Sequence, residues 1–190
     1  MKILIATPVV FEYVPDEVID AIKNLSVGSL DITYEILNGH NRAEARNAIV
    51  RSALTGSYDY VLMVDSDTVI PENTLKTFLS DPAPIILGMN PRGNDTNIYK
   101  PSDGFKDKYY LDKIPDGRFP IGGGMFSCAL IHTDVFKHLL EPYFEWYFYE
   151  YGGFYPDDLY FCLKAKRAGY TIWADSRIRC EHLVRFINSV

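Results

Sequence analysis

Short apolar runs recur along the chain and alternate with segments whose apolar residues repeat at helical spacing. The runs cover residues 2–7, 31–37, 59–65, 85–89, 125–132 and 170–174. Apolar runs of this length are typical of buried strands, and their alternation with helices is typical of sheets covered on both faces. The pattern therefore predicts an α/β fold, a three-layer sandwich with a central mixed, mostly parallel sheet flanked by helices.

Five helices are predicted between these runs. They begin near Pro15, at Asn41, at Pro71, at residue 133 and near Pro156, and the last should stop at Gly169. The second is the best defined, because Asn41 can cap it and Glu44 follows three residues later, as in a capping box. Its apolar residues form a buried stripe, whereas Arg42 and Arg46 are expected on its polar face.

Residues 90–120 interrupt the alternation. They are polar and rich in Gly, Pro, Asp and Lys, and only residues 109–111 are a candidate for ordered structure. Long loops inside compact domains are usually functional or disordered. We expect a mobile flap beside the functional site. The sequence has no repeats and no clear domain boundary, so its 190 residues predict one domain.

An acidic triplet, Asp65-Ser66-Asp67, follows the apolar run 60–64. Ligands of open α/β sheets bind beyond the carboxyl ends of the strands, so both carboxylates are expected where a ligand lies. Hard oxygen donors suit Mg²⁺ or Mn²⁺, which can bridge a protein to substrate phosphates. Our interpretation is a metal-assisted site for a nucleotide sugar, in which Asp67 binds the metal directly and Asp65 lies on the side of the ribose. The alternative is a solvated acidic turn after a strand.

Two further candidates lie near the end of the chain. His182 follows the predicted strand 170–174, and an imidazole ligand would favour Mn²⁺ over Mg²⁺. Asp157 and Asp158 open the last predicted helix, where the helix dipole alone would favour negative charge. The pair therefore has a purely structural explanation as well as a chemical one, and a histidine near a terminus is often a surface residue.

Bulk properties exclude several classes of protein. The net charge is −6 and no block of Lys or Arg stands out, so nucleic acid is not an expected partner. No apolar run approaches the ~20 residues of a transmembrane helix, and the first residues suit a strand better than a signal peptide. Three widely spaced cysteines (Cys128, Cys162 and Cys180) predict reduced core thiols and a cytoplasmic protein.

Several motifs together resemble those of small GT-A fold glycosyltransferases. They are ARN at 45–47, DSD at 65–67, GGGMFSCALIHTDVF at 122–136, EPYF at 141–144, DDLYFCLKAKRAGY at 157–170, and His182. Each motif is weak, but their order along nearly the whole chain is fairly specific. The resemblance implies a GT-A-like domain over residues 1–190, with a nucleotide-binding part of about 1–90 and an acceptor and catalytic part of about 91–190.

The resemblance also implies roles for individual residues. Thr7, Pro8 and Arg46 would form the nucleotide pocket of a UDP- or GDP-sugar donor, and Asp65, Asp67 and His182 would bind Mn²⁺ or Mg²⁺. Gly123 and Gly124 would approach donor or acceptor through their backbone. In inverting relatives the second acid of a pair at this helix removes the acceptor's proton, which implies Asp158 as the base. The family more often has Glu-Asp, so the helper role of Asp157 is open, and the resemblance favours inversion without fixing it.

Residues 143–155 are unusually rich in aromatic side chains, directly before the acidic pair. Flat rings with polar tips suit a sugar or another amphipathic acceptor, such as a glycan that offers a hydroxyl. We single out Trp146 and Tyr151 as acceptor contacts. Core packing or a contact between subunits of a homo-oligomer explains most of these rings equally well.

Three other functions remain possible. Asp65 and Asp67 also fit the signature of a phosphatase of the haloacid dehalogenase type, although that motif normally closes the first strand of its domain. A sugar nucleotidyltransferase usually has a glycine-rich, basic loop after its first strand, which residues 9–12 lack. A domain that binds a nucleotide or glycan without turnover is the alternative outside enzymology.

Overall fold

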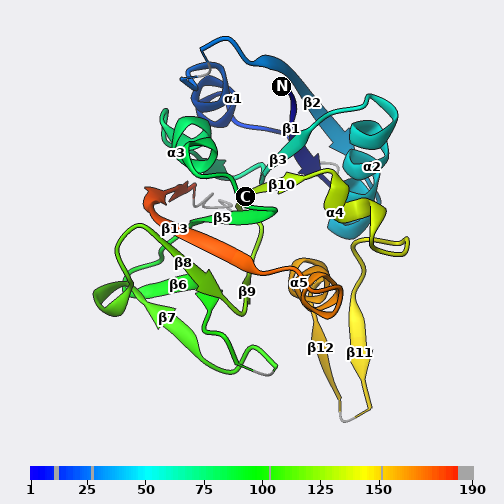
Figure 1. The fold of residues 1–190 in the computed structure, drawn as a ribbon, viewed down its shortest axis with the longest axis vertical. Helices are drawn as coiled ribbons and strands as arrows, with labels where there is room; N and C mark the ends of the chain where they lie inside the picture. Colours follow the sequence, from blue (N-terminus) through cyan, green and yellow to red (C-terminus); the bar gives the residue numbers. More distant parts are fainter. Residues whose placement is uncertain (11–12, 27, 103, 151, 184–190) are drawn as a thin grey trace, which may run out of the picture.

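A computed structural model describes residues 1–10, 13–26, 28–102, 104–150 and 152–183. Seven strands form its central sheet in the order β2-β1-β3-β10-β5-β13-β8 (Figure 1). In that order they span Asp31–Asn38, Lys2–Val9, Tyr60–Val64, Cys128–His132, Ile85–Met89, Ile172–Arg179 and Arg118–Ile121. β10 and β8 run antiparallel to their neighbours, while the other five strands share one direction. The predicted mixed, mostly parallel sheet is confirmed.

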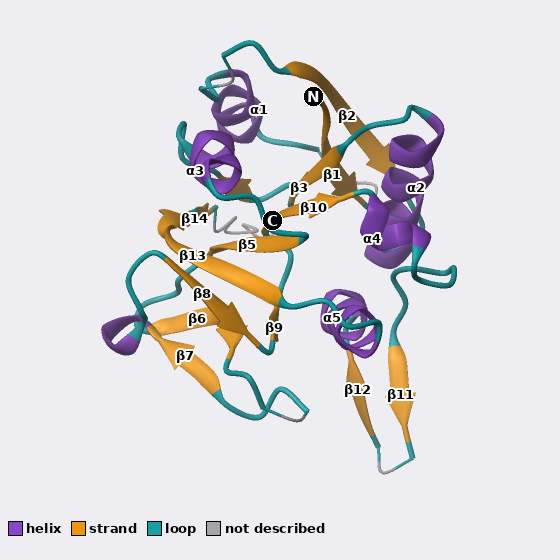
Figure 2. Ribbon diagram, in the orientation of Figure 1, coloured by secondary structure: helices purple, strands orange, loops and turns teal. Residues whose placement is uncertain are grey.

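Helices cover both faces of this sheet, which gives the predicted three layers (Figure 2). The helices are α1 (Asp16–Lys23), α2 (Arg42–Thr55), α3 (Thr74–Ser80), α4 (Asp134–Lys137) and α5 (Asp157–Arg167). Alternate residues of each strand point to opposite faces. In β3, Val61 and Met63 pack with α2, α4 and α5, while Leu62 and Val64 pack with α1 and α3. The continuous apolar runs in the sequence reflect this burial on two faces.

Local signals explain where two of the helices begin and end. The Asn41 side chain accepts a hydrogen bond from the Glu44 amide, as predicted for the start of α2. The Glu44 carboxylate accepts from the amide of His40, one residue earlier than a capping box requires. Gly169 follows α5 with φ of +89°, the left-handed conformation predicted for it. α3 starts at Thr74, not Pro71, and α4 covers only Asp134–Lys137, whereas the sequence predicts a helix over residues 133–140.

The prediction of a long flap over residues 90–120 is wrong. This part of the chain contains β6 (Asp95–Tyr99), β7 (Lys108–Tyr110), a 3₁₀ turn (Leu111–Lys113) and β8, and a second sheet has the order β7-β6-β9. β9 is only Gly123–Gly124. A Cβ on Gly124 would lie 2.8 Å from Leu87 and 2.9 Å from Ile98, so close packing requires glycine there. Strands this short, polar or glycine-rich give no alternating signal.

Two small ladders complete the fold. β11 (Tyr147–Tyr149) and β12 (Gly153–Tyr155) form a hairpin that extends away from the sheet beyond α5 (Figure 1). β4 (Thr68–Val69) pairs with β14 (Glu181–His182), so a segment directly after β3 lies against the end of the described chain. All three cysteines are buried and free, as predicted. No helix in the described ranges combines the length and apolar character needed to cross a membrane.

Candidate active site

The acidic triplet lies directly after β3, at the carboxyl edge of the parallel strands, as predicted. A tight turn holds it: the amide of Thr68 donates to the carbonyl of Asp65, and the amide of Asp65 donates to the carbonyl of Ser127. Asp65 is buried, whereas a third of the Asp67 side chain is exposed. The two carboxylates therefore differ in environment, and each faces a different set of partners.

The short β4–β14 ladder brings His182 to the triplet. His182 pairs with Thr68 in the ladder, and the amide of Leu183 donates to the carbonyl of Asp67 at 2.8 Å. The Nε2 atom of His182 consequently lies 3.3 Å from Oδ2 of Asp67. More than 110 residues separate these side chains in the sequence, and the structure places them together as the predicted metal ligands would be.

Arg92 completes an outer group with Asp67 and His182. Its guanidinium, from the segment after β5, forms a hydrogen bond with Nε2 of His182. The buried Nδ1 atom of the same imidazole has no hydrogen-bond partner among the described residues. A carboxylate and an imidazole nitrogen at this distance both attract a cation, and here Arg92 supplies one.

An inner cluster lies deeper, around Arg46. Its guanidinium is 2.7 Å from Asp157, 3.1 Å from Asp65 and 3.5 Å from Asp158, and the rings of Phe126 and Phe144 flank it. Only 1% of Arg46 is exposed, so its predicted place on a polar helix face is wrong. An arginine normally keeps its charge in water. Here three buried carboxylates stabilise the charged guanidinium, and without Arg46 each of these carboxylates would be a buried charge without a partner of opposite sign.

Burial and charge compete in setting the pKa values of the inner cluster. Burial acts to lower the pKa of Arg46, but the three carboxylates outweigh it, and the pKa lies above its ordinary value. Burial raises the pKa of Asp65, and Arg46 and Arg42 offset part of this change. Burial likewise raises the pKa of Asp158 to about 6, with Arg46 opposing and the neighbouring carboxylates reinforcing the shift.

Asp158 is also held in position by backbone amides. Its Oδ2 accepts from the amide of Phe126 at 3.2 Å, and its Oδ1 accepts from the amide of Leu159 at 2.8 Å. These contacts fix the carboxylate at the start of α5, next to the glycine-rich segment. An aspartate that is ionised at neutral pH, yet more basic than an ordinary aspartate, is suited to proton abstraction.

Both groups of residues line one cavity of about 310 Å³. Seven of the predicted site residues line it: Arg46, Asp65, Asp67, Trp146, Asp157, Asp158 and His182. The cavity is also lined by residues for which no role in the site is predicted, among them Arg42, Arg92, Met125 and Ser127. For Arg92 a signal existed, because it follows β5 at the same edge of the sheet as the triplet. It was missed because residues 90–120 were interpreted as a loop.

Other predicted residues lie elsewhere. Thr7 and Pro8 are buried in β1, where the Thr7 hydroxyl is 3.2 Å from the hydroxyl of Tyr34, and neither is among the residues that line the cavity. Gly123 and Gly124 are buried in β9, with close neighbours from the protein itself. Tyr151 lies outside the described residues. Roles for these residues in binding remain predictions.

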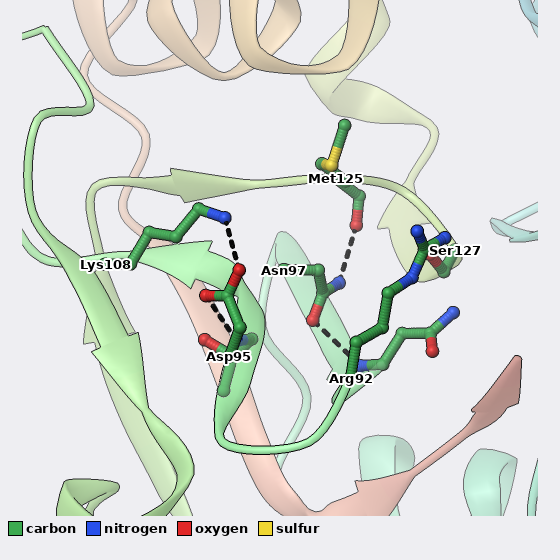
Figure 3. Close-up of a pocket in the computed structure, with 8 residues that line it drawn as sticks. Arg92, Asp95, Asn97, Lys108, Met125 and Ser127 are labelled. Atoms are coloured by element: carbon green, nitrogen blue, oxygen red, sulfur yellow. Dashed lines mark hydrogen bonds and ion pairs between the residues drawn. The ribbon is translucent and has the colours of Figure 1, made fainter.

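A smaller cavity of about 200 Å³ adjoins the first and shares Arg92, Met125 and Ser127 with it (Figure 3). Figure 3 shows Arg92 and Ser127 at one end and the Lys108–Asp95 ion pair, 2.9 Å long, at the other. Asn97 joins the walls by accepting from the amide of Asn90 and donating to the carbonyl of Met125. The side-chain oxygen of Asn90, buried here, has no partner among the described residues.

The residues present fit a divalent cation as a partial set of ligands. Within the described ranges no three His, Cys, Asp or Glu side chains gather as a metal-binding group. In the cavity, Asp67 and His182 face one another at 3.3 Å, and Asp65 lines the same cavity. A set of this size suits Mg²⁺ or Mn²⁺, which proteins often hold through one or two carboxylates together with phosphates and water.

The sequence matches no protein-family model and no curated protein. Solved structures do resemble it. A197 from STIV shares 19% identity, with a TM-score of 0.69 over 97% of this chain and 87% of that one. GalNAc-T7, solved with UDP, GalNAc and Mn²⁺, shares 10% identity, with a TM-score of 0.67 over 98% of this chain and 44% of that one.

The mannosyltransferase PcManGT from Pyrobaculum calidifontis, in complex with GDP-Man and Mn²⁺, shares 15% identity and has a TM-score of 0.61. The match covers 98% of this chain and 58% of that one. At these identities the likeness concerns the fold, and the chain spans about half of the two longer transferases. The seven-stranded mixed sheet, its flanking helices and these neighbours show that the chain has the GT-A fold of glycosyltransferases.

Proposed function

We propose that this protein is a metal-dependent glycosyltransferase that moves a sugar from a UDP- or GDP-sugar to an acceptor hydroxyl. One observation carries the proposal: Asp158, Asp65, Asp67 and His182, from three distant segments, line one cavity. A transferase of this kind must hold a diphosphate, stabilise the charge that develops on it, and activate a hydroxyl. The cavity offers groups for each task within one fold that glycosyltransferases share.

Asp67 and His182 would hold the divalent cation, with Asp65 as a further ligand or a contact to the ribose. When bound, Mn²⁺ or Mg²⁺ would stabilise negative charge on the leaving diphosphate. Two of the structural neighbours support this choice, because GalNAc-T7 was solved with UDP and Mn²⁺ and PcManGT with GDP-Man and Mn²⁺. Arg92, which contacts His182 in the outer group, would be free to face the diphosphate once the imidazole nitrogen is occupied.

Asp158 would accept the proton of the acceptor hydroxyl. Its carboxylate is fixed by two amides, and its raised pKa of about 6 leaves it ionised at neutral pH. Asp157 would act through Arg46, because its carboxylate forms the shortest ion pair of the guanidinium. In this arrangement Arg46 keeps the acids close together. A direct base of this kind favours inversion at the transferred carbon.

The remaining residues are assigned by the same proposal. Residues of about 1–90, with Thr7, Pro8 and Arg46, would form the nucleotide part, and residues of about 91–190 the acceptor and catalytic part. Gly123 and Gly124 would bring the backbone near the sugar. The smaller cavity, with the unpartnered oxygen of Asn90, offers a polar wall for hydroxyl groups.

Two alternatives are judged against the structure. A haloacid dehalogenase-type phosphatase would use Asp65 as a nucleophile, but Asp65 is buried against Arg46 and the fold is that of GT-A glycosyltransferases. A binding domain without turnover would share the same cavity. A buried carboxyl with a pKa near 6 has no evident use in such a domain, which favours the enzyme.

The test is a thermal-shift panel of UDP-, GDP-, CDP- and dTDP-sugars, each with and without Mn²⁺. We expect one nucleotide class to raise the melting temperature only when Mn²⁺ is present, and Asp67→Asn to abolish the shift. The stabilising donor would then be incubated with a hydroxyl acceptor library and product followed by mass spectrometry. No stabilisation by any donor contradicts the donor assignment, and metal-dependent stabilisation without product under any acceptor supports the binding domain.

A further inference from the structure

The β11–β12 hairpin has aromatic side chains on both faces, and the face without hydroxyl groups is the more exposed of the two. Trp146, Phe148 and Phe154 are 47%, 71% and 49% exposed. Two tyrosines of the opposite face contact rings outside the hairpin: Tyr147, which is 42% exposed, stacks on Tyr160 of α5 at 4.6 Å, and Tyr155 contacts Phe105 at 5.4 Å. Apolar rings are therefore exposed at least as much as the tyrosines, although a hydroxyl group makes a tyrosine the better ring to face water.

The three exposed rings form one continuous surface, here called the aromatic ridge. Phe148 and Phe154 are cross-strand partners with ring centroids 5.8 Å apart, and Trp146 lies 5.1 Å from Phe154. Trp146 also lines the cavity that contains Asp158. The aromatic ridge therefore leads from the candidate active site outward along the hairpin.

Several contacts hold the hairpin and the segment before it in place. Lys164 of α5 binds Glu145 at 3.0 Å and also donates to the carbonyl of Pro142. Gly153 lies under the ring of Tyr149, where a Cβ would meet the tyrosine oxygen. A surface that is apolar, exposed and held in place is typical of a binding site and is unusual without one.

The size and charge of the ridge restrict its occupant. Aromatic side chains bury about 150–250 Å² each, so the exposed fractions correspond to roughly 250–400 Å². This area is about half or less of the ~800 Å² per partner in a stable protein interface. The hairpin segment 145–155 carries Glu145 and Glu150 and no Lys or Arg, which opposes adsorption to an anionic bilayer.

We infer that the aromatic ridge binds the hydrocarbon chain of an amphipathic acceptor whose hydroxyl-bearing head reaches Asp158. Phe148 and Phe154 have no polar groups with which to orient a sugar, whereas the flat faces of phenyl and indole rings pack well against an alkyl or isoprenoid chain. This inference rests on the proposed function, because it names the class of acceptor for the same site.

The experiment uses methyl, butyl and octyl β-glucosides as probes, below the concentration at which the longest forms micelles. Dissociation constants come from saturation-transfer NMR on the full chain, which needs neither metal nor donor. A fully buried methylene improves affinity about fourfold, so a chain on an open ridge should gain about twofold per methylene. Octyl glucoside has seven more methylenes than methyl glucoside, so we expect a gain of about a hundredfold if the whole chain lies on the ridge, and at least about tenfold if half of it does.

Phe148→Ala should weaken octyl glucoside binding about fivefold and leave methyl glucoside unchanged. Leu140→Ala is the matched control, because Leu140 is an apolar side chain that is 88% exposed outside the hairpin. It should bind the series like the wild type. Since Phe148 is mostly exposed, its replacement should leave the melting temperature unchanged, and Phe148→Leu should restore part of the octyl affinity.

Four results would overturn the inference. Affinity independent of chain length, or equally dependent in Phe148→Ala, removes the ridge as the binding surface. Affinity that grows with the length of lipid-free oligosaccharides and falls in Phe148→Ala assigns the ridge to a glycan. Binding to phosphatidylcholine vesicles without binding of single octyl glucoside assigns it to a bilayer. A dimer in light scattering that Phe148→Ala dissociates assigns it to a second copy of the chain.

The outcome is separable from that of the proposed function. A chain-length effect that persists in protein with no affinity for any nucleotide sugar would remove the transferase and keep the lipid-binding ridge. If the protein transfers sugar but its affinity for the glucosides does not depend on the length of the alkyl chain, the proposed function stands and the lipid-binding ridge is ruled out.

Discussion

The inner cluster and the outer group meet in one cavity but are built in opposite ways. Arg46, Asp65, Asp157 and Asp158 are buried, and each carboxylate lies within 3.5 Å of the same guanidinium. Asp67 and His182 are partly exposed, and Arg92 is exposed. Breaking contacts in the inner cluster leaves buried charge uncompensated, whereas contacts in the outer group can be exchanged for water or ligand at little cost.

This difference indicates how the proposed work is divided. The inner cluster is arranged before any substrate arrives, as acid–base chemistry requires of a base that must not reorient. The outer group has competing contacts, because one imidazole nitrogen faces both a carboxylate and a guanidinium. We expect the outer group to rearrange when a metal and a diphosphate bind, and the inner cluster to stay in place.

The largest expected effect is that of Asp158→Asn on transfer. A general base supplies about 10²–10⁴ in rate, so product formation should fall by that factor. The amide keeps the shape of the carboxylate, and donor binding should persist in the thermal-shift assay. Equal losses of donor binding and rate would place Asp158 in the donor site. They would contradict the assignment of acid–base chemistry to the inner cluster and of donor binding to the outer group.

Arg46→Ala should have the largest effect on folding. Removing one partner of a buried ion pair costs about 3–5 kcal/mol, and here three carboxylates lose their partner. Arg42→Ala is the control on the same helix, because Arg42 is 3.6 Å from Asp65 and partly exposed, and it should cost at most about 1 kcal/mol. Urea unfolding measures both. Similar values for the two variants would contradict the distinction between buried and exposed contacts.

His182→Ala should weaken Mn²⁺ binding in the presence of the nucleotide by at least about tenfold, because even partners of metal ligands contribute 10–100-fold. Electron paramagnetic resonance of free Mn²⁺ gives the affinity directly. His132→Ala is the matched control. His132 is the last residue of β10, at the end of the strand away from Ser127 and the cavity, and this variant should bind Mn²⁺ as the wild type does. The melting temperature without metal should change little, since the imidazole lies in the exchangeable outer group.

The pH dependence should be the mildest effect. With a pKa of about 6 for Asp158, the rate should be level above pH 7 and fall about tenfold per pH unit well below pH 6. For stability the sign is reversed. A carboxyl whose pKa is raised on folding binds its proton more tightly in the folded state, so its contribution is present below about pH 4 and is lost as the pH rises through 6. A rate that does not fall below pH 6 would contradict the assignment of Asp158 as the base that titrates.

Those parts of the fold that are marked by a run of apolar residues or by a helix-capping residue could be predicted from the sequence. Six of the seven strands of the central sheet, all except β8, follow from apolar runs. The start of α2 follows from Asn41, and the acidic turn after β3 follows from the position of Asp65. The convergence of His182 with Asp67 followed from motif order alone. No local pattern announces a two-residue ladder between β4 and β14.

Other features depend on tertiary contacts that the sequence leaves unspecified. Arg46 was expected on a polar face because its charge, taken alone, favours water, and only the three approaching carboxylates reverse that preference. The second sheet was missed because β6 and β7 are short and polar and β9 is two glycines. The orientation of the hairpin's two aromatic faces is likewise invisible until its register is known.

The two-residue ladder between β4 and β14 has a consequence for how tightly a cation is held. The proposed imidazole ligand, His182, depends on a pairing with few hydrogen bonds, which is expected to open far more often than the seven-stranded sheet. Any ion that bridges Asp67 and His182 would also stabilise the pairing of β4 with β14. Protection of the Leu183 amide against deuterium should therefore rise with manganese concentration, which would make this amide a reporter of occupancy.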